Sequence, residues 1–395
     1  MKTEIYFDHA ATTKLRSKAL DAMLPYLQDS FGNPSGTYAL ARQSAKAIDE
    51  ARRSVAKTLG CRPQEIVFTG HGTESINAAI KGIAFAQQQA GMGNHIVTSN
   101  IEHHAVQHSC DYLEKFGFET TYVPVDEYGL VDPAAVANAV NERTVLVSVM
   151  LANNEVGTIE PMAEISAAVH ERALSMRRQI PVHTDAVQGA NSLDLRIEKL
   201  GVDVMSLSAH KFGGPKGAGI LYMRRGTPFL SQESGGGQER QRRAGTENVA
   251  GIVGTSVALH EAQANREAYV EVCAPLSRRI TDSIVEAIPG AILNGHPKER
   301  LPNNVHISFE GAESDAMLSA LDKLDIAASA GSACTSATWE PSHVLTAMGI
   351  PLRAAAGVLR ITFGPENTDD EADYLLSVLP KIVADSRADA GASAK

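Results

Sequence analysis

The sequence is poor in aromatic residues and has no long apolar run. Of its 395 residues 5% are aromatic and only one is Trp, whereas 44% are hydrophobic and 21% are charged, which is ordinary for a globular protein. No stretch has the length that a membrane helix requires, and no apolar signal region follows Met1. We therefore expect a protein without membrane contact that folds into two or three structural units.

Basic residues and cysteines are also scarce. The formal net charge is −10, and a general nucleic-acid binder needs a basic face, so we expect no direct nucleic-acid partner. Two candidate basic patches remain, one formed by Arg172, Arg177 and Arg178 and the other by Arg240, Arg242 and Arg243. The cysteines are widely scattered, without a CxxC pair: Cys61, Cys110, Cys273 and Cys334. This pattern predicts no metal site and favours a reducing cytoplasm.

Short apolar runs alternate with helical patterns over the first two thirds of the chain. The predicted strands are 65–69, 95–99, 120–124, 144–151, 180–184, 202–207 and 218–223. The helical segments between them include 73–89, 133–140 and 162–172. This alternation predicts an α/β domain with a mostly parallel seven-stranded sheet covered on both faces. Ligands of such sheets bind at the carboxyl ends of the strands.

The pattern changes after about residue 254, where a smaller α+β unit is expected. Its predicted elements are a long helix at 257–288, strands at 304–309 and 358–362, a helix at 314–324, and a last helix that opens with the capping box Thr368–Glu371. We expect a large domain at 15–256 and a small domain formed by 1–14 and 257–385. The small polar residues 386–395 predict a flexible tail.

A lysine stands directly after one predicted strand, in Ser208-Ala-His-Lys211. Such a lysine, followed by a glycine-rich turn, is well placed for a Schiff base to an aldehyde cofactor, although most lysines in turns are simply solvated. Ser208 and His210 beside it can hold a phosphate. After the preceding strand, Asp185 can face the nitrogen of a pyridine ring and Gln188 its phenolic oxygen, although a helix N-cap is the plain alternative for Asp185.

Three further polar groups follow other strands. Gly72 and Thr73 open a helix, where free amides and a hydroxyl favour a phosphate, although an ordinary turn also fits. His103 can stack on a ring, or be structural. Asn154 lies in a turn whose buried amides need partners or a ligand. Because the carboxyl ends of parallel strands meet at one edge, these groups together predict a single site for pyridoxal phosphate (PLP).

Cys334 is surrounded by small residues from Ala327 to Thr338. Such a segment can hardly anchor itself by burial, so we expect it to be mobile. Most cysteines are buried hydrophobes, but these surroundings favour a nucleophilic thiolate.

With these residues in place, the sequence resembles the cysteine desulfurases of the class V aminotransferase family (PLP fold type I). The Ser-Ala-Cys-Thr-Ser run around Cys334 resembles the NifS/IscS-like group in particular. The similarity runs from about Tyr6 to Thr368. It rests on the motifs Tyr6–Thr13, Phe31–Ser35, Thr73–Ser75, Ala152–Gly157, His183–Gln188, Ser208–Lys211, Gly235–Arg240, Arg243–Asn248, Gly331–Ser336 and Glu340–His343.

The resemblance implies that L-cysteine is converted to L-alanine and that its sulfur is left as a persulfide on Cys334. Lys211 would carry the cofactor as a Schiff base and remove the α-proton of the substrate. Asp185 would pair with the pyridinium nitrogen, and Gln188 would contact the phenolic oxygen. His103 would stack on the ring and assist proton transfer.

The resemblance also implies how the phosphate and the substrate are held. The groups on the phosphate would be Gly72, Thr73, Ser208, His210 and, from the neighbouring subunit of a homodimer, Thr246. Asn154 and Arg360 would hold the substrate, with a bidentate grip of the guanidinium on the carboxylate. The expected partner is a sulfur acceptor such as an iron–sulfur scaffold, and Cys334 would contact a cluster only transiently.

Two rival functions remain open at this point. Another class V enzyme, a selenocysteine lyase or an aminotransferase, would share Lys211 and Asp185 without needing Cys334. A catalytically idle sulfur-transfer scaffold would have the same fold but no enzymatic activity. The sequence leaves the acceptor pathway open between iron–sulfur clusters, tRNA thiolation, DNA phosphorothioation and nitrogenase. It assigns no role to Trp339 or to the Arg-rich insertion at 174–179.

Overall fold

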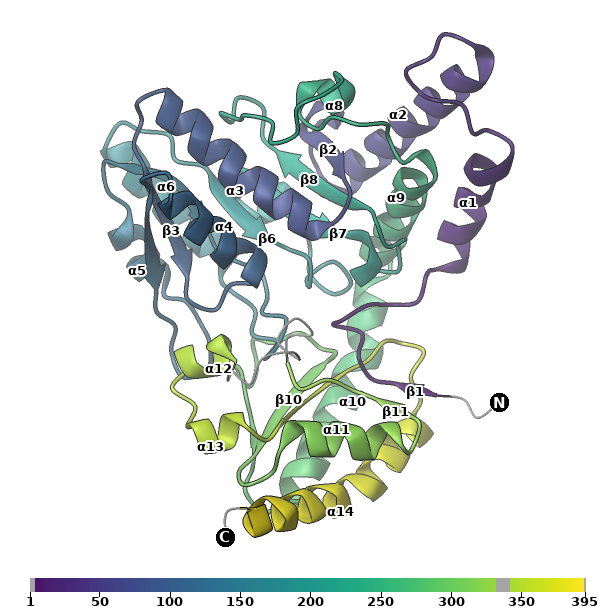
Figure 1. Cartoon of the computed structure of the whole chain (residues 1–395), viewed down its shortest axis with the longest axis vertical. Helices are drawn as coiled ribbons and strands as arrows, with labels where there is room; N and C mark the ends of the chain where they lie inside the picture. The colour runs from purple at the N-terminus through teal and green to yellow at the C-terminus, as the bar shows by residue number, and fades with distance from the viewer. Residues whose placement is uncertain (1–3, 332–341, 394–395) are drawn as a thin grey trace.

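The chain is described by a computed structural model that covers residues 4–331 and 342–393. Its largest element is a seven-stranded sheet with the strand order β2-β8-β7-β6-β5-β3-β4 (Figure 1). The strands are β2 (Ile66–Thr69), β3 (His95–Ser99), β4 (Glu119–Val123), β5 (Thr144–Ser148), β6 (Val182–Asp185), β7 (Val204–Ser208) and β8 (Gly219–Met223). Only β8 runs against its two neighbours, so the mostly parallel sheet is confirmed.

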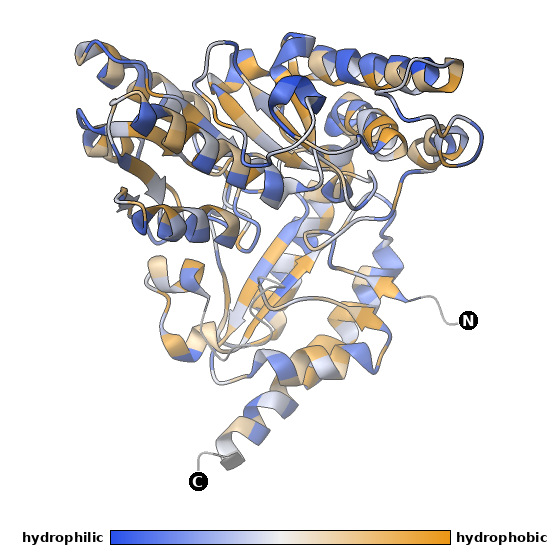
Figure 2. Ribbon diagram, turned by 45° about the horizontal axis from the view of Figure 1, so that its top comes forward, coloured by the Kyte–Doolittle hydropathy of each residue, from blue (hydrophilic) through white to orange (hydrophobic). Residues whose placement is uncertain are grey.

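Helices cover both faces of this sheet. One face packs against α2 (Ala39–Leu59), α6 (Met162–Ser175) and α9 (Val249–Ala264), and the other against α3 (Gly72–Gln89) and α4 (His104–Glu114). Strand residues alternate between the two cores, since Ile220 and Tyr222 enter the first and Leu221 the second. Figure 2 shows the apolar residues concentrated on the strands and inward helix faces.

The remaining helices of this half are shorter or peripheral. They are α1 (Ser17–Gln28), α5 (Pro133–Ala139), α7 (Ile197–Leu200), α8 (Gln238–Gln241) and the 3₁₀ turns η1 (Pro63–Glu65) and η2 (Ala209–Lys211). In the Arg-rich insertion, Arg178 donates to the backbone carbonyl of Met92 at 2.6 Å. The insertion therefore packs back onto the domain.

The second unit lies below the sheet in Figure 1. Its strands β9 (Ala291–Leu293), β10 (Asn304–Phe309) and β12 (Val358–Thr362) form an antiparallel sheet, and β1 (Ile5–Tyr6) pairs with β11 (Ile326–Ala327). Its helices are α10 (Arg266–Ala287), α11 (Ser314–Asp322), α12 (His343–Ala347), α13 (Leu352–Ala355) and α14 (Asp369–Ser393). Its core is separate from the two cores of the large sheet.

The boundary between the units differs from the predicted one. Residues 257–288 are not one helix but the end of α9 and all of α10, which meet at Asn265. Leu259 and Ala262 pack into the core of the large sheet, whereas Tyr269 packs into the small core. The division therefore lies at about Asn265 rather than at 257.

The first and last described elements, β1 and α14, both belong to the small unit. Phe7, just after β1, is fully buried in its core. The predicted tail at 386–395 is wrong as far as Ser393, because α14 continues to that residue. Ser386 accepts from the amide of Glu313 at 2.9 Å, and this contact attaches the end of the helix to the unit. The capping box is confirmed, since Thr368 and Glu371 exchange both of its hydrogen bonds.

In the described ranges, no helix is long and apolar enough to cross a membrane. Within the same ranges, no group of three His, Cys, Asp or Glu side chains is arranged to hold a metal ion.

Candidate active site

Lys211 lies at the carboxyl end of β7, in the short turn η2. Its Nζ donates to the backbone carbonyls of Ala10 and, at 2.8 Å, Ala11. Gln188 Nε2 donates to the same Ala10 carbonyl at 3.0 Å. The residues 8–13, which we call the strap, therefore bring Lys211 and Gln188 together.

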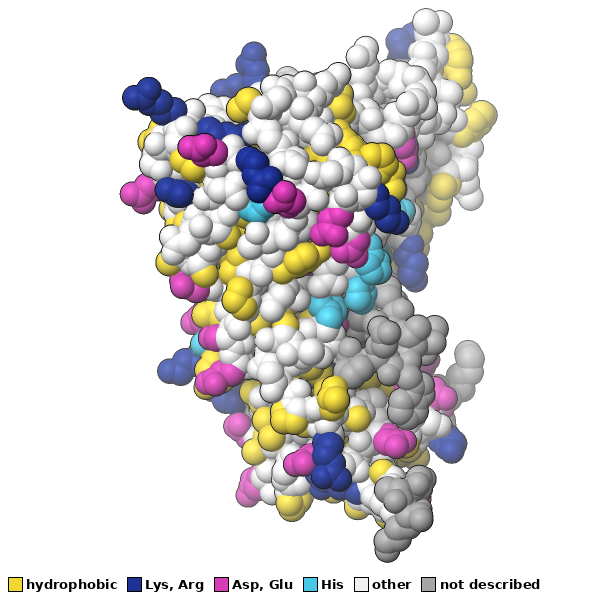
Figure 3. Space-filling model, turned by 60° about the vertical axis from the view of Figure 1, so that its left-hand side comes forward, with side chains coloured by type: hydrophobic (Ala, Val, Ile, Leu, Met, Phe, Trp, Pro, Cys, Tyr) yellow, Lys and Arg dark blue, Asp and Glu magenta, His cyan; other side chains and the backbone are white. Residues whose placement is uncertain are grey.

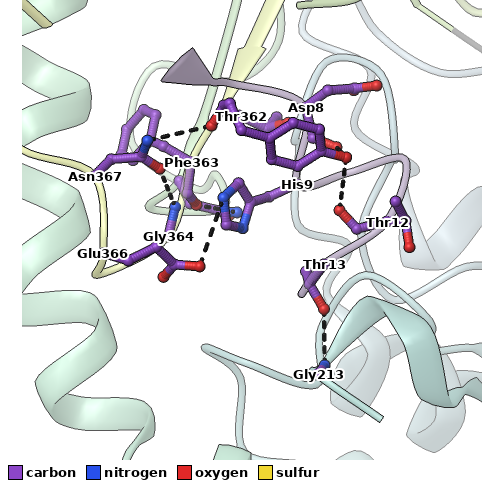
Figure 4. A network of polar contacts seen from close by, with 12 residues as sticks. Asp8, His9, Thr12, Thr13, Gly213, Thr362, Phe363, Gly364, Glu366 and Asn367 are labelled. Carbon is purple, nitrogen blue, oxygen red and sulfur yellow. Dashed lines mark hydrogen bonds and ion pairs between the residues drawn. The ribbon is translucent and has the colours of Figure 1, made fainter. Parts of the chain in front are cut away.

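The strap is fixed at both of its ends. Thr13 accepts from the amide of Gly213 at 2.8 Å and donates to the carbonyl of His210 at 2.8 Å. At the other end, the amide of Ala10 donates to Thr362 Oγ1 at 2.9 Å. Figure 4 shows the strap between Thr362 and its neighbours on one side and Gly213 on the other. The strap thus joins the small unit to the turn that carries Lys211.

Asp185 ends β6, beside β7, and is 6% exposed. Its Oδ1 accepts from the amide of Val187 at 3.0 Å, and no helix begins there, so the N-cap alternative does not hold. Burial raises the pKa of the Asp185 carboxyl to about 6, against the opposing effects of the Val187 amide and the Lys211 ammonium. A buried acid near the partly buried Lys211 is suited to face a cationic ring nitrogen.

The predicted phosphate turn meets the Lys211 turn. The amide of Gly72, the first residue of α3, donates to Ser208 Oγ at 3.3 Å. A Cβ added at Gly72 would lie 2.9 Å from the Ser208 Cβ, so only glycine allows this close approach. Thr73 is exposed beside the first amides of the helix, and amides at a helix start attract anions. His71, the residue before Gly72, caps the start of α3, because its Nδ1 accepts from the amide of Glu74 at 3.0 Å.

The two imidazoles of the site are uncharged at neutral pH. Burial, reinforced by the Lys211 charge, lowers the pKa of both His103 and His210 to about 4. His103 Nδ1 accepts from the amide of Ala105 at 3.0 Å, which assigns the proton of the neutral ring to Nε2. His210 Nδ1 lies 3.1 Å from Thr12 Oγ1 of the strap.

Arg360 on β12 reaches the same region from the small unit. Its side chain is 2% exposed, and Nη1 donates to the backbone carbonyl of Asn154 at 2.9 Å. Nη2 pairs with Asp8 Oδ1 at 2.9 Å. Arg360 and the Asn154 turn therefore lie together, as predicted, with Asp8 of the strap as a third member.

Comparisons with known proteins agree with this site. The family model described as "Aminotransferase class-V" matches residues 5–375. The chain is 48% identical to a protein named cysteine desulfurase IscS from Methanosarcina thermophila, over 96% of this chain and 92% of that protein. Among solved structures it resembles a NifS-like protein with a TM-score of 0.90 and 36% identity, over 97% and 100% of the two chains. It also resembles SspA in complex with cysteine, with a TM-score of 0.80 and 35% identity, over 93% and 100%.

This chain belongs to the cysteine desulfurases of the class V aminotransferase family.

PLP is the cofactor of this cysteine desulfurase, and the site has the matching chemistry. An amine, a buried acid and an anion-attracting helix start meet at the carboxyl ends of three strands or the turns that follow them. Thr184 Oγ1, next to Asp185, is a buried hydroxyl without a hydrogen-bond partner in the described part of the chain, and buried polar atoms of this kind mark places where a ligand completes the bonding. The residues fit the group.

Cys334 lies outside the described residues, as does Trp339. The described residues on either side of this segment both approach Glu155. Ser342 Oγ donates to Glu155 Oε2 at 2.6 Å, and a Cβ added at Gly331 would lie 3.2 Å from the same oxygen. Glu155 adjoins Asn154, so Gly331 and Ser342 both lie near the Asn154 turn and Arg360.

Thr246 is the predicted site residue that the subunit does not bring to its own phosphate turn. It is exposed. Among the described residues, its hydroxyl makes no hydrogen bond to Thr73, Ser208 or His210.

Sequence reasoning assigned no role to Glu102, although it stands next to His103. Its carboxyl is fully buried and accepts from Ser99 Oγ at 2.5 Å and from the amide of Met150 at 3.0 Å. Burial raises the pKa of this carboxyl to about 8, against those two hydrogen bonds. A buried acid without an ion-pair partner has no local sequence pattern. The only feature of the sequence that pointed to Glu102 was its position in the Glu-His-His run.

Further histidines gather on the surface near this site (Figure 3). The ring centroid of His104 lies 5.1 Å from that of His108 and 4.8 Å from that of His343. His343 belongs to α12, whose Val344 and Leu345 pack with Ile101 and Met150. These contacts hold the start of α12 against the residues that follow the carboxyl ends of β3 and β5.

Proposed function

We propose that this enzyme takes the sulfur of L-cysteine onto Cys334. The observation that carries the proposal is the position of Glu155. It contacts the residues on both sides of the Cys334 segment and adjoins the Asn154 turn, to which Arg360 donates. The similar SspA structure holds cysteine, which supports the same substrate here.

In this proposal the cofactor is held by groups at the strand ends. Lys211 would bond to it covalently, the Asp185 carboxylate would pair with its ring nitrogen, Gln188 would contact its phenolic oxygen, and His103 would lie against the ring. Its phosphate is bound by Gly72, Thr73, Ser208 and His210. When bound, PLP supplies an electron sink that makes the α-proton of the substrate acidic.

The chain's own groups perform the remaining steps. Arg360 grips the substrate carboxylate, and the amide of Asn154 completes this binding. Lys211 Nζ then accepts the α-proton as the general base of the site. His103 is neutral, with a proton on Nε2, so near pH 7 it can donate a hydrogen bond from this nitrogen to the cofactor or the substrate.

The sulfur step uses the thiolate of Cys334. Its Sγ attacks the sulfur of the substrate, so an S–S bond forms as the Cβ–S bond breaks. The electron pair of the broken bond stays with the carbon skeleton, which is protonated and leaves as alanine. The product on the protein is the Cys334 persulfide.

We propose a homodimer in which Thr246 binds the phosphate of the neighbouring subunit. Its exposure on its own subunit supports this placement. α1 packs against α9, the helix that follows Thr246. Leu20, Leu24 and Leu27 form an exposed stripe along α1, followed by Phe31 and Tyr38, which are 70% and 54% exposed. An apolar face of this kind is suited to meet its own copy.

The persulfide passes to an acceptor protein, for which we propose an iron–sulfur scaffold, in the cytoplasm. The three described cysteines are free thiols, as expected in a reducing compartment: Cys61, Cys110 and Cys273.

Replacement of Cys334 tests this function. The Cys334→Ala protein should retain the visible absorbance of bound PLP and lose sulfide and alanine formation from L-cysteine. Cys61→Ala, at a half-buried thiol away from the site, is the matched control and should keep full activity. Desulfuration by Cys334→Ala at the rate of the unmodified enzyme would refute the persulfide step. A purified protein without PLP absorbance would favour the idle scaffold.

A further inference from the structure

Three consecutive residues in the turn before Arg243–Thr246 have left-handed backbones, and none of them is glycine. The φ angles of Glu239, Arg240 and Gln241 are 46°, 58° and 64°. Residues with a Cβ rarely adopt this conformation, and a run of three persists only where the surroundings impose it.

A buried ion pair imposes it here. Glu239 accepts two parallel hydrogen bonds from the guanidinium of Arg52, at 2.7 and 2.6 Å. The two side chains are 1% and 6% exposed. Arg52 comes from α2, so the pair ties the left-handed turn to the body of the large domain.

The same carboxylate also closes the edge of the sheet. β2 is the outermost strand, and the amide of Phe68 on its open side donates to Glu239 Oε2 at 3.0 Å. Arg52 Nη1 donates to the carbonyl of Ile66 at 2.8 Å, and the guanidinium carbon lies 4.9 Å from the centre of the Phe68 ring. Glu239 and Arg52 thus occupy the place that a further strand would take.

The turn is continuous with an otherwise exposed segment. Gln238 Oε1 accepts from the amide of Gly245 at 3.1 Å, so the turn sets the path of the backbone up to Thr246. Arg243 donates to Glu74, in the first turn of α3, at 3.0 Å. Glu239 and Ala244 are the buried residues of the segment 231–246, and Thr246 is presented outward.

We infer that Arg52 and Glu239 are positioning residues that fix the left-handed turn so that Thr246 meets the phosphate of the neighbouring subunit in one conformation. This rests on the proposed placement of Thr246 and adds the device that maintains it. A pair that served stability alone would affect the whole protein and would not depend on the phosphate of the cofactor.

The test compares PLP with pyridoxal, which has the same ring and aldehyde but no phosphate. The full-length protein is freed of cofactor, and the dissociation constants of both compounds are measured by absorbance titration. For Glu239→Gln we expect the constant for PLP to rise at least tenfold and that for pyridoxal to change less than twofold. Glu233→Gln is the control, because Glu233 lies 3.5 Å from Arg243 in the same segment but is half-exposed.

Arg52→Lys is a second variant in case Glu239→Gln does not fold. It keeps a buried positive charge beside Glu239 but cannot form the two parallel bonds. It should show the same selective loss of PLP affinity to a smaller degree. Equal losses for PLP and pyridoxal in the variants that fold, or no loss, would overturn the inference.

A mixed dimer separates this inference from the placement of Thr246. One subunit carries Glu239→Gln, and the other carries Lys211→Ala with an unchanged turn. The absorbance of cofactor bonded to Lys211 then reports only the first subunit, whose phosphate meets the unchanged turn, so its PLP affinity should return to normal. If it stays weak while the variant homodimer shows the selective loss, the turn acts within its own subunit and the placement of Thr246 is wrong. If Thr246→Val loses PLP affinity selectively and Glu239→Gln does not, the placement stands and the inference fails.

Discussion

Arg360 of β12 and Asp8 of the strap form an ion pair at 2.9 Å, with the arginine side chain 2% exposed and the aspartate 19%. In the proposed function the same guanidinium binds the carboxylate of L-cysteine. Asp8 therefore competes with the substrate for one arm of the arginine.

Removal of this competitor should tighten substrate binding. We expect Asp8→Asn to lower KM for L-cysteine several-fold, about 1 kcal/mol of binding free energy, because a charge-assisted bond to Arg360 becomes available. The kcat should change little. Steady-state kinetics checks this, with Asp282→Asn on the exposed face of α10 as the control. An unchanged or higher KM would show that Asp8 orients the arginine instead of competing for it.

Arg360→Lys should have the opposite effect. A lysine keeps the charge but cannot make two parallel bonds, so we expect KM to rise at least tenfold, about 1.4 kcal/mol. The absorbance of bound PLP should remain unchanged. Loss of that absorbance would assign Arg360 to the cofactor rather than to the substrate.

Asp185→Asn should change the stability of the cofactor-free and cofactor-bound proteins in opposite directions. The raised pKa means that folded Asp185 keeps its proton up to about pH 6, whereas the unfolded chain loses it near 3.8. Its ionisation therefore costs up to about 3 kcal/mol of stability as pH rises between these values. At pH 8 the cofactor-free variant should unfold at higher urea concentration than the unmodified protein, and its affinity for PLP should be at least tenfold lower. Equal urea midpoints at pH 8 would contradict the burial cost.

Glu102→Gln should flatten the dependence of stability on pH. The Glu102 pKa is raised from 4.5 to about 8, so the folded protein holds a proton that the unfolded chain has released, and stability falls as pH rises between these values. The full effect is at most about 5 kcal/mol. Glutamine keeps an oxygen for Ser99 and Met150 but does not ionise. The stability of the variant relative to the unmodified protein should therefore increase from pH 5 to pH 9. Urea unfolding at both pH values measures this, and parallel pH curves would refute it.

A charge in the α1 stripe should separate the proposed dimer. We expect Leu24→Glu to shift the protein towards monomers in sedimentation equilibrium at micromolar concentration, because the carboxylate would be buried in the interface. Its PLP affinity should fall with it, since Thr246 would be lost from the neighbouring site. Leu174→Glu is the control, because Leu174 is 75% exposed on the separate helix α6. A fully dimeric Leu24→Glu protein would place the interface elsewhere.

Local pattern was sufficient for the large sheet and for placing Asp185 and Lys211 at the ends of neighbouring strands. Its strands are apolar runs bounded by turns, so their limits were predicted within a few residues, as at His95–Ser99. Lys211 and Asp185 could be found because parallel strands bring their carboxyl ends to one edge.

Pattern failed where a distant contact decides the structure. β1 and β11 have two residues each and exist only through their mutual pairing. The Arg52–Glu239 and Asp8–Arg360 pairs join residues far apart in the sequence, and a buried charge has no local signature. The end of the last helix, from 386 to 393, was predicted as a tail because its small residues resemble a linker, although alanine is the best helix former.

The strap has a consequence for the order in which this enzyme is made. Residues 8–13 leave the ribosome long before Thr362, yet the amide of Ala10 bonds to Thr362, 352 residues later in the chain. The carbonyls that hold Lys211 therefore cannot be in place until translation has nearly ended, even if the large sheet folds as it emerges. A nascent chain therefore cannot bind the cofactor in the final geometry until the small unit is complete, and it cannot release reactive sulfur before then.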